Sequence, residues 1–305
     1  MSIRNALKEI VDPGQPLRSA ELARLTKLTD DERREFAETW PNVPVERRRQ
    51  VLEQLMDLAE DNVEFDFDVI FFEALDDSDP AVRISAVRGL WEHEHRDVIP
   101  RLIGLVQDDE NAAVRAEAAL ALGRFVMLGE FEEARPRDVE AVTDALRRVV
   151  ADPAEAVEVR GRAVESLGAS SQPWARDIIH DAYDSGDPRL MTSAVHAMGR
   201  SVDSYWLPTI IDELQNDDPE IRYEAASSAG MIEDEEAVPY LVDMVGDEDS
   251  DVREQVLIAL GAIGGEEAIE ALREQTNSPD ERTREAAMQA LEEAEFGDDP
   301  LGFQG

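Results

Sequence analysis

The sequence predicts an all-α fold, a right-handed α-α superhelix (solenoid) of about eight helix pairs. Three observations support this prediction: one helical pattern returns along most of the 305 residues, successive copies in the second half are 31 residues apart, and fixed places in each copy hold small or apolar residues. A unit of this length holds two short helices and their turns. Such a unit buries its apolar side only against the next unit.

The clearest copy runs from Asp218 to Gly230 and reads DPEIRYEAASSAG. Asp218 is suited to cap the free amides of a first helical turn, and Pro219 fits the first helical position because no N–H is needed there. At 100° per residue, Ile221 and the alanines after it fall on one arc, and Tyr223 lies on the other. The segment is therefore predicted to be a helix with one buried face.

An arginine marks the same position in most copies. The equivalent residues are Arg83, Arg115, Arg160, Met191, Arg222, Arg253 and Arg284, and subtraction of their numbers gives four consecutive intervals of 31 at the end of the series. Positions three and seven after this marker are small or apolar, which predicts the buried seam. Each marker arginine is expected to reach a carboxylate in the turn of an adjacent unit, such as Asp218 or Asp249.

The sixth position after the marker is small in every copy. It holds Gly89, Ala121, Ser166, Ala197, Ser228, Ala259 and Ala290. The helical arc puts this position outside the seam, so its small size indicates close contact with the helix of a neighbouring repeat.

An amphipathic segment precedes each marked helix, as in Ser204 to Gln215 and Ala237 to Val245. The resulting helix pair resembles the HEAT repeat of the short bacterial and archaeal type that also occurs in phycobilisome lyase subunits. The resemblance rests on the lines DPAVRISAVRGL, DPEIRYEAASSAG and DSDVREQVLIALGAIG, which begin at Asp79, Asp218 and Asp249, and it covers roughly residues 60 to 295. It implies a HEAT-like solenoid.

The chain is predicted to have an N-terminal arm or cap at 1–28, the repeat array at 29–295 and a frayed tail at 296–305, which could instead be a short docking motif. The arm holds the only lysines, Lys8 and Lys27. It is either a docking arm, for an acidic partner or for the chain's own body, or a short capping helix around Ile3 to Val11.

The first repeat is expected to be degenerate, as a terminal unit without an outer neighbour has to be. Thr29 to Glu32 has the spacing of a capping box, and Val45 to Ala59 has apolar residues at helical intervals. The run Arg47-Arg48-Arg49 within it is interpreted as a solvated helix face, with an anion site as the alternative.

An insertion separates the third and fourth copies of the pattern. The interval from Arg115 to Arg160 exceeds 31 by 14 residues, and most of the excess falls around 124–138. Insertions in a repeat array build a binding loop or a bend, or they form a tolerated surface loop.

The composition bounds the classes of function. With 70 acidic and 30 basic residues the net charge is −40, so nucleic acid and anionic membranes should be repelled. The absence of cysteine removes disulfides, thiolate metal sites and cysteine nucleophiles. Residues 1–28 contain no long apolar run, so neither a signal peptide nor a membrane span is expected, and a cytoplasmic location is the default.

The predicted binding surface follows from the resemblance, because HEAT-type arrays line their concave face with the second helix of each pair. Its outward positions hold Arg88, Arg124, Arg162 and Arg200 in the early copies, and Tyr223 opens the later, more acidic ones. The later positions also include Glu224, Glu254, Gln255, Glu285 and Glu293. The hypothesis is that the arginines hold an acidic segment of a protein partner or an anionic group. In the alternative, Glu92, Glu117 and Glu165 neutralise them in surface pairs.

Catalysis is not expected. The HEAT-like deoxyhypusine hydroxylases, which this array resembles, bind a di-iron centre through His-Glu pairs directly after the marker, where this chain has residues such as Thr192-Ser193 and Tyr223-Glu224. His93 and His95 do not share a helical face, so no metal site is predicted there. No cofactor is expected. The predicted function is a non-catalytic protein-protein interaction scaffold or adaptor; the alternative is a bilin-lyase-like or deoxyhypusine-hydroxylase-like HEAT enzyme subunit.

Overall fold

The computed structural model of the chain describes residues 3–91 and 96–298, with side chains placed up to Glu295. Every regular element in these residues is a helix. The α-helices are α1 (Arg4–Val11), α2 (Ser19–Leu22), α3 (Asp30–Thr39), α4 (Val45–Asp61), α5 (Asp68–Ala74), α6 (Pro80–Gly89), α7 (Ile99–Asp108), α8 (Ala112–Glu130), α9 (Pro136–Ala151), α10 (Val157–Leu167), α11 (Pro173–Tyr183), α12 (Pro188–Arg200), α13 (Leu207–Glu213), α14 (Pro219–Ile232), α15 (Val238–Asp243), α16 (Ser250–Ile263), α17 (Glu266–Gln275) and α18 (Glu281–Asp298).

From α3 onward, the described helices follow one another as eight pairs, each with a first and a second helix. The second helices are the even-numbered ones, α4 to α18. They carry the marker residues at the expected places, so the predicted solenoid of about eight helix pairs is confirmed.

The chain divides into two compact units. Unit 1 comprises Met1–Phe125 and Ala134–Val149, and unit 2 comprises Val126–Glu133 and Val150–Gly305. Two of the three boundaries fall in the predicted insertion around 124–138, and the third lies near the end of α9. Helix α8, which enters this insertion, has 19 residues, whereas the second helix α14 of a regular repeat has 14. Part of the inserted sequence therefore lengthens α8, and a short turn then leads into α9.

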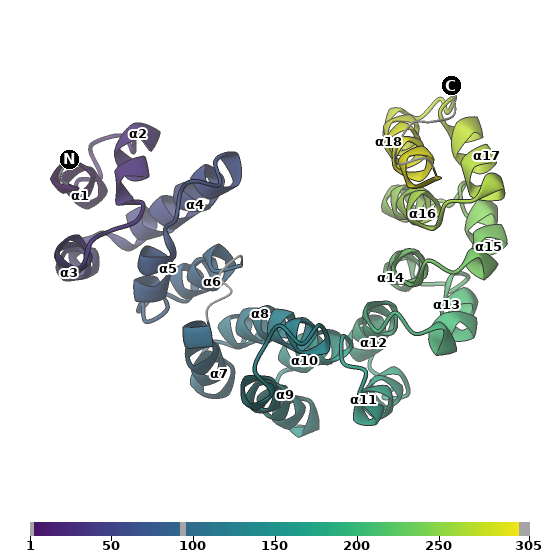
Figure 1. The fold of residues 1–305 in the computed structure, drawn as a ribbon, viewed down its shortest axis with the longest axis horizontal. Coiled ribbons are helices and arrows are strands. Elements are labelled where there is room, and N and C mark those ends of the chain that lie inside the picture. The colour runs from purple at the N-terminus through teal and green to yellow at the C-terminus, as the bar shows by residue number, and fades with distance from the viewer. Residues whose placement is uncertain (1–2, 92–95, 299–305) are drawn as a thin grey trace. The chain divides into compact units, whose positions relative to one another are not determined.

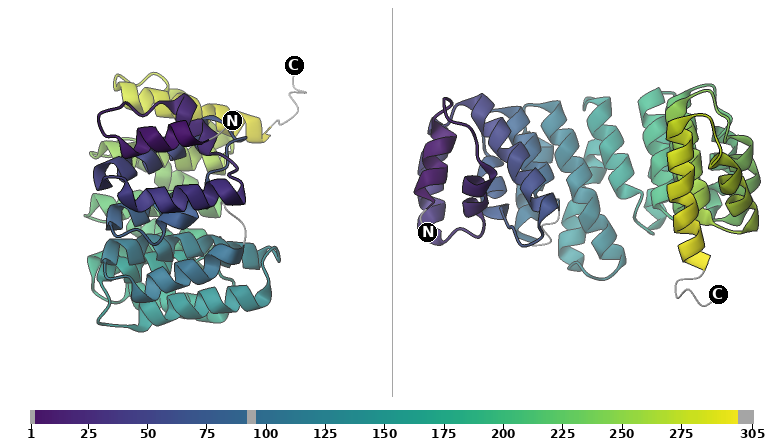
Figure 2. Two further views of the ribbon diagram at one scale, coloured as in Figure 1. Left: turned by 90° about the vertical axis from the view of Figure 1, so that its left-hand side faces the viewer. Right: turned by 90° about the horizontal axis from the view of Figure 1, so that it is seen from above.

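Unit 2 is built in two layers. The second helices α10, α12, α14, α16 and α18 pack side by side in sequence order, and the first helices α11, α13, α15 and α17 form the other layer (Figure 1). The helices of the unit are stacked one after another (Figure 2). This arrangement places equivalent positions of successive second helices next to each other.

Capping residues start the second helices where the sequence indicates. The Asp218 carboxylate accepts a hydrogen bond of 2.9 Å from the amide of Glu220, and the Asp249 carboxylate accepts one of 2.8 Å from the amide of Asp251. The Thr29 capping box is also present, since the amide of Glu32 donates to the Thr29 hydroxyl and the amide of Thr29 donates to the Glu32 carboxylate. Each such cap contributes about 1 kcal/mol.

The predicted seam is the core of the array. The residues three positions after the marker are all fully buried: Ala86, Ala118, Ala163, Ala194, Ala225, Val256 and Ala287. Seven positions after it, six of the seven residues are buried, and Leu291 of the last repeat is partly buried. Among the described residues no helix follows α18 to cover it.

The small sixth position meets a glycine of the preceding repeat. A Cβ on Gly199 would lie 2.6 Å from Cα of Ser228, and one on Gly230 would lie 3.0 Å from Cα of Ala259. The Ser228 hydroxyl also donates a hydrogen bond of 2.8 Å to the carbonyl of Val195. The inferred close contact between neighbouring second helices is therefore confirmed.

The marker arginines join neighbouring repeats. Arg253 lies 3.7 Å from Asp280 at the cap position of α18, the kind of residue that the sequence suggested, whereas Arg222 does not use the cap residue. Arg222 binds both carboxylate oxygens of Asp247, at 2.8 and 2.9 Å, and not the cap residue Asp249 two positions later. Its remaining terminal nitrogen donates to the carbonyl of Asn216 in its own turn. Both carboxylates also accept from backbone amides: Asp249 from those of Asp251 and Val252, and Asp247 from that of Asp249.

In unit 1 the same arrangement corrects the interpretation of the arginine run on α4. Arg48 is buried and lies 3.1 Å from the carboxylate of Asp77, so it acts as a marker arginine. Arg47 is also buried, and it donates to the backbone carbonyls of Glu9, Asp12 and Gln15. Two of the three arginines are therefore not solvated, and they tie α4 to the N-terminal arm and to the next repeat. Arg49 is exposed and pairs with Asp79.

The N-terminal arm contains the predicted capping helix, α1, in which Ile10 is buried, as is Ile3 directly before it. At the other end α18 continues to Asp298, beyond the predicted end of the array at Glu295, and residues 299–305 of the predicted tail lie outside the described residues. Among the described helices, none combines the length and the apolar character needed to cross a lipid bilayer.

Candidate binding groove on the second helices of unit 2

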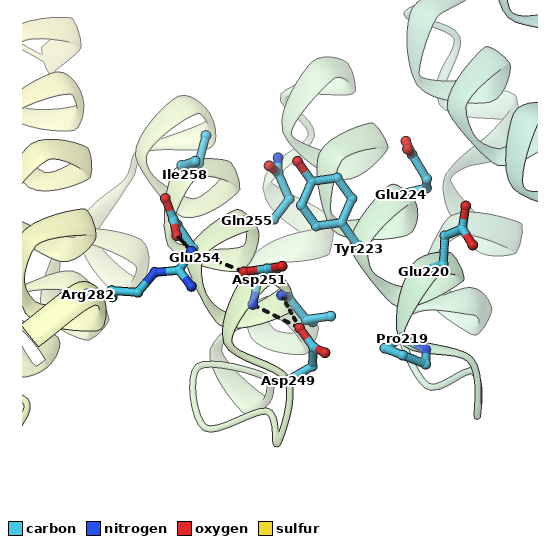
Figure 3. Close-up of a pocket in the computed structure, with 11 residues that line it drawn as sticks. Pro219, Glu220, Tyr223, Glu224, Asp249, Asp251, Glu254, Gln255, Ile258 and Arg282 are labelled. Carbon is cyan, nitrogen blue, oxygen red and sulfur yellow. Dashed lines mark hydrogen bonds and ion pairs between the residues drawn. The ribbon is translucent and has the colours of Figure 1, made fainter. Parts of the chain in front are cut away.

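A groove with a volume of about 630 Å³ lies along α14 and α16 in unit 2 and reaches the start of α18 (Figure 3). We call it the acidic groove. The lining residues that matter here are Glu220, Tyr223, Glu224, Asp251, Glu254, Ile258 and Arg282. A second hollow of about 330 Å³ shares Glu254, Ile258 and Arg282 and continues the groove over α18.

The repeat produces the groove directly. Because α14 and α16 carry their markers 31 residues apart, the outward positions one and two after Arg222 and Arg253 lie at the same height on adjacent helices. Tyr223 is thus placed near Glu254 and Gln255, as the outward arc predicted. The glycine contacts hold the helices close together without filling this outer side.

Carboxylates dominate the rim of the groove. Glu254 and Asp251 share one cation, Arg282, whose terminal nitrogen lies 2.7 and 3.0 Å from their oxygens. Glu220 lies 2.9 Å from Arg189 of α12, and Glu224 lies 3.0 Å from the imidazole of His196. Glu285 and Glu293 add two further carboxylates along the continuation on α18.

Partial burial and the negative charge of nearby carboxylates raise the pKa of the Tyr223 phenol. Partial burial raises the pKa of Tyr223 above its ordinary value, and the charges of Glu224, Glu254 and Asp251 raise it further. The same carboxylates that favour the neutral phenol of Tyr223 would stabilise a cation bound next to it.

The groove also exposes apolar surface. The exposed fraction is 37% for Tyr223 and 43% for Ile258. Figure 3 shows Tyr223 between the carboxylates of α14 and the side chains of Asp251 and Gln255 on α16. An exposed ring and an exposed aliphatic side chain beside carboxylates can accept a chain that carries both charge and apolar groups.

Unit 1 has its own hollow, also of about 630 Å³, between the end of α4 and the helices α5, α6 and α8. Phe65, Phe67 and Phe71 contribute its aromatic wall, and the largely exposed Trp91 lies at its edge. Arg88 lines it and pairs with Glu117 at 2.8 Å. Residues 92–95, which include His93 and His95 and the predicted counter-charge Glu92, lie outside the described residues.

The five predicted site residues are distributed over both units. Arg88 and Arg124 belong to unit 1, where the guanidinium carbon of Arg124 lies 5.0 Å from the centre of the Phe125 ring. Arg162, Arg200 and Tyr223 belong to unit 2, and of these Tyr223 lies in the acidic groove.

Two of the arginines already have carboxylate partners of the kind that the alternative interpretation named. Arg162 lies 2.8 Å from Glu165 and 3.8 Å from Glu158. In the part of the chain that the structure describes, Arg88 likewise has Glu117. Arg200 is half-buried, and burial lowers its pKa, which the charge of Glu165 partly opposes.

Sequence reasoning missed the residues two positions before the marker. In unit 2 this column reads Glu158, Arg189, Glu220, Asp251 and Arg282, again at intervals of 31. Arg189 bridges Glu158 and Glu220, and Arg282 contacts Asp251. The signal was present in the repeat alignment, but it becomes readable as a ladder only when the second helices are known to lie side by side.

Within residues 3–91 and 96–298, no group of three histidine, aspartate or glutamate side chains has an arrangement that could hold a metal ion. Directly after the marker of α12, Ser193 is buried and donates a hydrogen bond of 2.7 Å to the carboxylate of Glu165. Tyr223 and Glu224 line the acidic groove together.

Comparison with known proteins identifies the repeat. A family model described as HEAT repeats matches residues 70–157 and 207–292, which together make up more than half of the chain. No curated protein sequence matches the chain.

Several solved structures match the chain at low sequence identity. Human deoxyhypusine hydroxylase is 20% identical, with 96% of each chain covered and a TM-score of 0.38. The CpcE and CpcF complex of phycocyanin lyase from Nostoc sp. PCC7120 is 17% identical, with 74% of this chain and 94% of that chain covered and a TM-score of 0.47. The Escherichia coli protein YibA is 17% identical, with 81% and 96% covered and a TM-score of 0.46. On the family match, this chain belongs to the HEAT-repeat family.

Proposed function

We propose that this protein is a non-catalytic scaffold that binds a protein partner along the outward face of its second helices. The acidic groove on α14, α16 and α18 is the observation that supports this proposal, because repeat arrays present extended surfaces in place of enclosed pockets. A net charge of −40 favours a protein over nucleic acid or an anionic membrane as the partner. A cytoplasmic location stays a prediction.

Site-specific cross-linking tests the proposal. A photoreactive amino acid replaces Gln255, which lines the acidic groove, or Tyr240, which is exposed on the first-helix layer. Irradiation of full-length protein in its native cell extract is expected to yield a defined protein adduct at Gln255 and none at Tyr240. Equal labelling at both positions, or none at either, would contradict a scaffold that uses the second helices.

The acidic partner segment expected at Arg88, Arg124, Arg162 and Arg200 stays a separate prediction. The glutamates already paired with Arg88 and Arg162 would compete with such a segment. Replacing Arg124 and Arg162 by glutamate and repeating the capture of the cross-linked partner tests it. Unchanged recovery of that partner would remove these arginines from the interface.

A further inference from the structure

The ladder two positions before the marker alternates in charge except at one place. From α10 to α18 it reads Glu158, Arg189, Glu220, Asp251, Arg282, so the two carboxylates of Glu220 and Asp251 are the only like-charged neighbours in it. Both side chains are well exposed, at 53% and 69%. Both line the acidic groove.

The neighbouring ion pairs of the ladder show that side chains at this position can meet across adjacent second helices. Arg189 reaches Glu220 at 2.9 Å from one side, and Arg282 reaches Asp251 at 3.0 Å from the other. At this position an arginine on one second helix therefore reaches a carboxylate on the adjacent second helix. Between Glu220 and Asp251 the chain supplies no such cation among its described residues, and Tyr223 lies there instead (Figure 3).

We propose that an arginine or lysine of the partner protein occupies this place, between Glu220 and Asp251 and over the ring of Tyr223, and completes the alternation of charge. The proposal rests on the scaffold function and names the chemistry of its partner: a basic, extended segment with an apolar residue on the same face as the cation, two positions away. A guanidinium in this position pairs with both carboxylates and gains the attraction of the tyrosine ring.

Ile258 is the reason that we expect an apolar residue beside the cation of the partner segment. It is 43% exposed and lines both the acidic groove and its continuation over α18. Neighbouring packed helices lie about 9 Å apart, so crossing from α14 to α18 takes about 18 Å, or about six residues of extended chain. One face of such a segment can present its cation to Tyr223 and an aliphatic side chain to Ile258.

Fluorescence anisotropy with synthetic peptides and the full-length protein tests the proposal. In three labelled probes every second residue is glycine, and the residues between, which share one face of an extended chain, alternate arginine with leucine, arginine with serine, or glutamate with leucine. The arginine-leucine peptide is expected to bind most tightly, and the glutamate-leucine peptide is expected not to bind. Replacing Glu220 by Gln and Asp251 by Asn should weaken binding of the first peptide about tenfold. Ile258→Ser should weaken it while leaving the arginine-serine peptide unchanged.

The matched control separates the site from the overall charge. Glu267→Gln with Glu270→Gln removes two charges from the exposed side of α17, in the first-helix layer of the same unit. If this variant loses as much affinity as the groove variant, the peptide binds the acidic body without a site and the proposal fails. It also fails if Tyr223→Ala binds as tightly as the unchanged protein.

The two proposals fail in different ways. A protein adduct at Gln255 together with no site-specific binding of the arginine-leucine peptide overturns the basic segment and leaves the scaffold in place. If the adduct proves to be a second copy of this chain, the acidic groove is a self-association surface and the proposed partner is wrong.

Discussion

Arg222 and Asp247 form a bidentate ion pair, at 2.8 and 2.9 Å, that joins the turn of one repeat to the turn of the next. Both side chains are about nine-tenths buried. The same guanidinium also binds the carbonyls of Asn216 and Asp217, so it closes its own turn and holds its neighbour. Arg83 and Asp109 repeat the arrangement in unit 1 at 2.7 Å.

Removing one partner of this pair should destabilise unit 2 strongly. Arg222→Ala leaves the Asp247 carboxylate buried without its counter-charge, and the expected loss is about 3–5 kcal/mol in the free energy of unfolding. Urea titration followed by circular dichroism measures it. The control is Arg273→Ala, whose exposed pair with Glu295 should contribute at most about 1 kcal/mol. Equal effects of the two substitutions would show that the buried pair is not structural.

The same pair predicts a pH dependence. Burial raises the pKa of Asp247, but the hydrogen bonds from Arg222 and from the amide of Asp249 outweigh it, so the pKa lies below its ordinary value. A carboxyl whose pKa is lowered on folding stabilises the protein above its unfolded pKa of about 3.9, and this contribution is lost as the pH falls through the folded value.

Comparison with Asp247→Asn isolates this contribution from the relief of charge repulsion that acid also brings. The difference in unfolding free energy between the two proteins should be largest at neutral pH and shrink below pH about 4. Urea titrations across this range measure the difference. A constant difference would mean that Asp247 does not titrate in the predicted window.

The close contact between second helices predicts opposite effects for two helical glycines. Gly199→Ala puts a methyl group 2.6 Å from Cα of Ser228, so the backbones must shift, and we expect a loss of about 1–3 kcal/mol. Gly104→Ala in α7 meets nothing within 4 Å and should gain about 0.5–1 kcal/mol from helix propensity. Urea titration of both variants measures these changes in the free energy of unfolding. A more stable Gly199→Ala variant would contradict the close contact between α12 and α14.

Arg47 should hold the N-terminal arm in place. Arg47→Ala leaves the carbonyls of Glu9, Asp12 and Gln15 without their shared donor, at an expected local cost of about 2–3 kcal/mol. Hydrogen exchange of the α1 amides should become faster, while α16 stays protected. Arg34→Ala removes an exposed pair on α3 and should leave α1 unchanged. Unaltered exchange in the Arg47 variant would mean that α1 is held by its apolar residues alone.

The sequence by itself determined the helix pairs, the seam and the close approach of the second helices. Each of these features depends on the local pattern of residues. Asp218 and Pro219 start a helix, and apolar residues at helical spacing define its buried face. The interval of 31 residues repeats this face in the next copy. Once Ala225 and Val256 occupy equivalent places, their burial follows from stacking.

Only the tertiary structure decided which side chains meet across repeats. Arg222 pairs with Asp247 and not with Asp249, although both carboxylates also accept hydrogen bonds from backbone amides. The proposed ligand place between Glu220 and Asp251 forms only when α14 and α16 lie side by side, with Tyr223 between the two carboxylates. Such contacts depend on turn geometry and on the direction of long side chains, which the local pattern of residues does not specify.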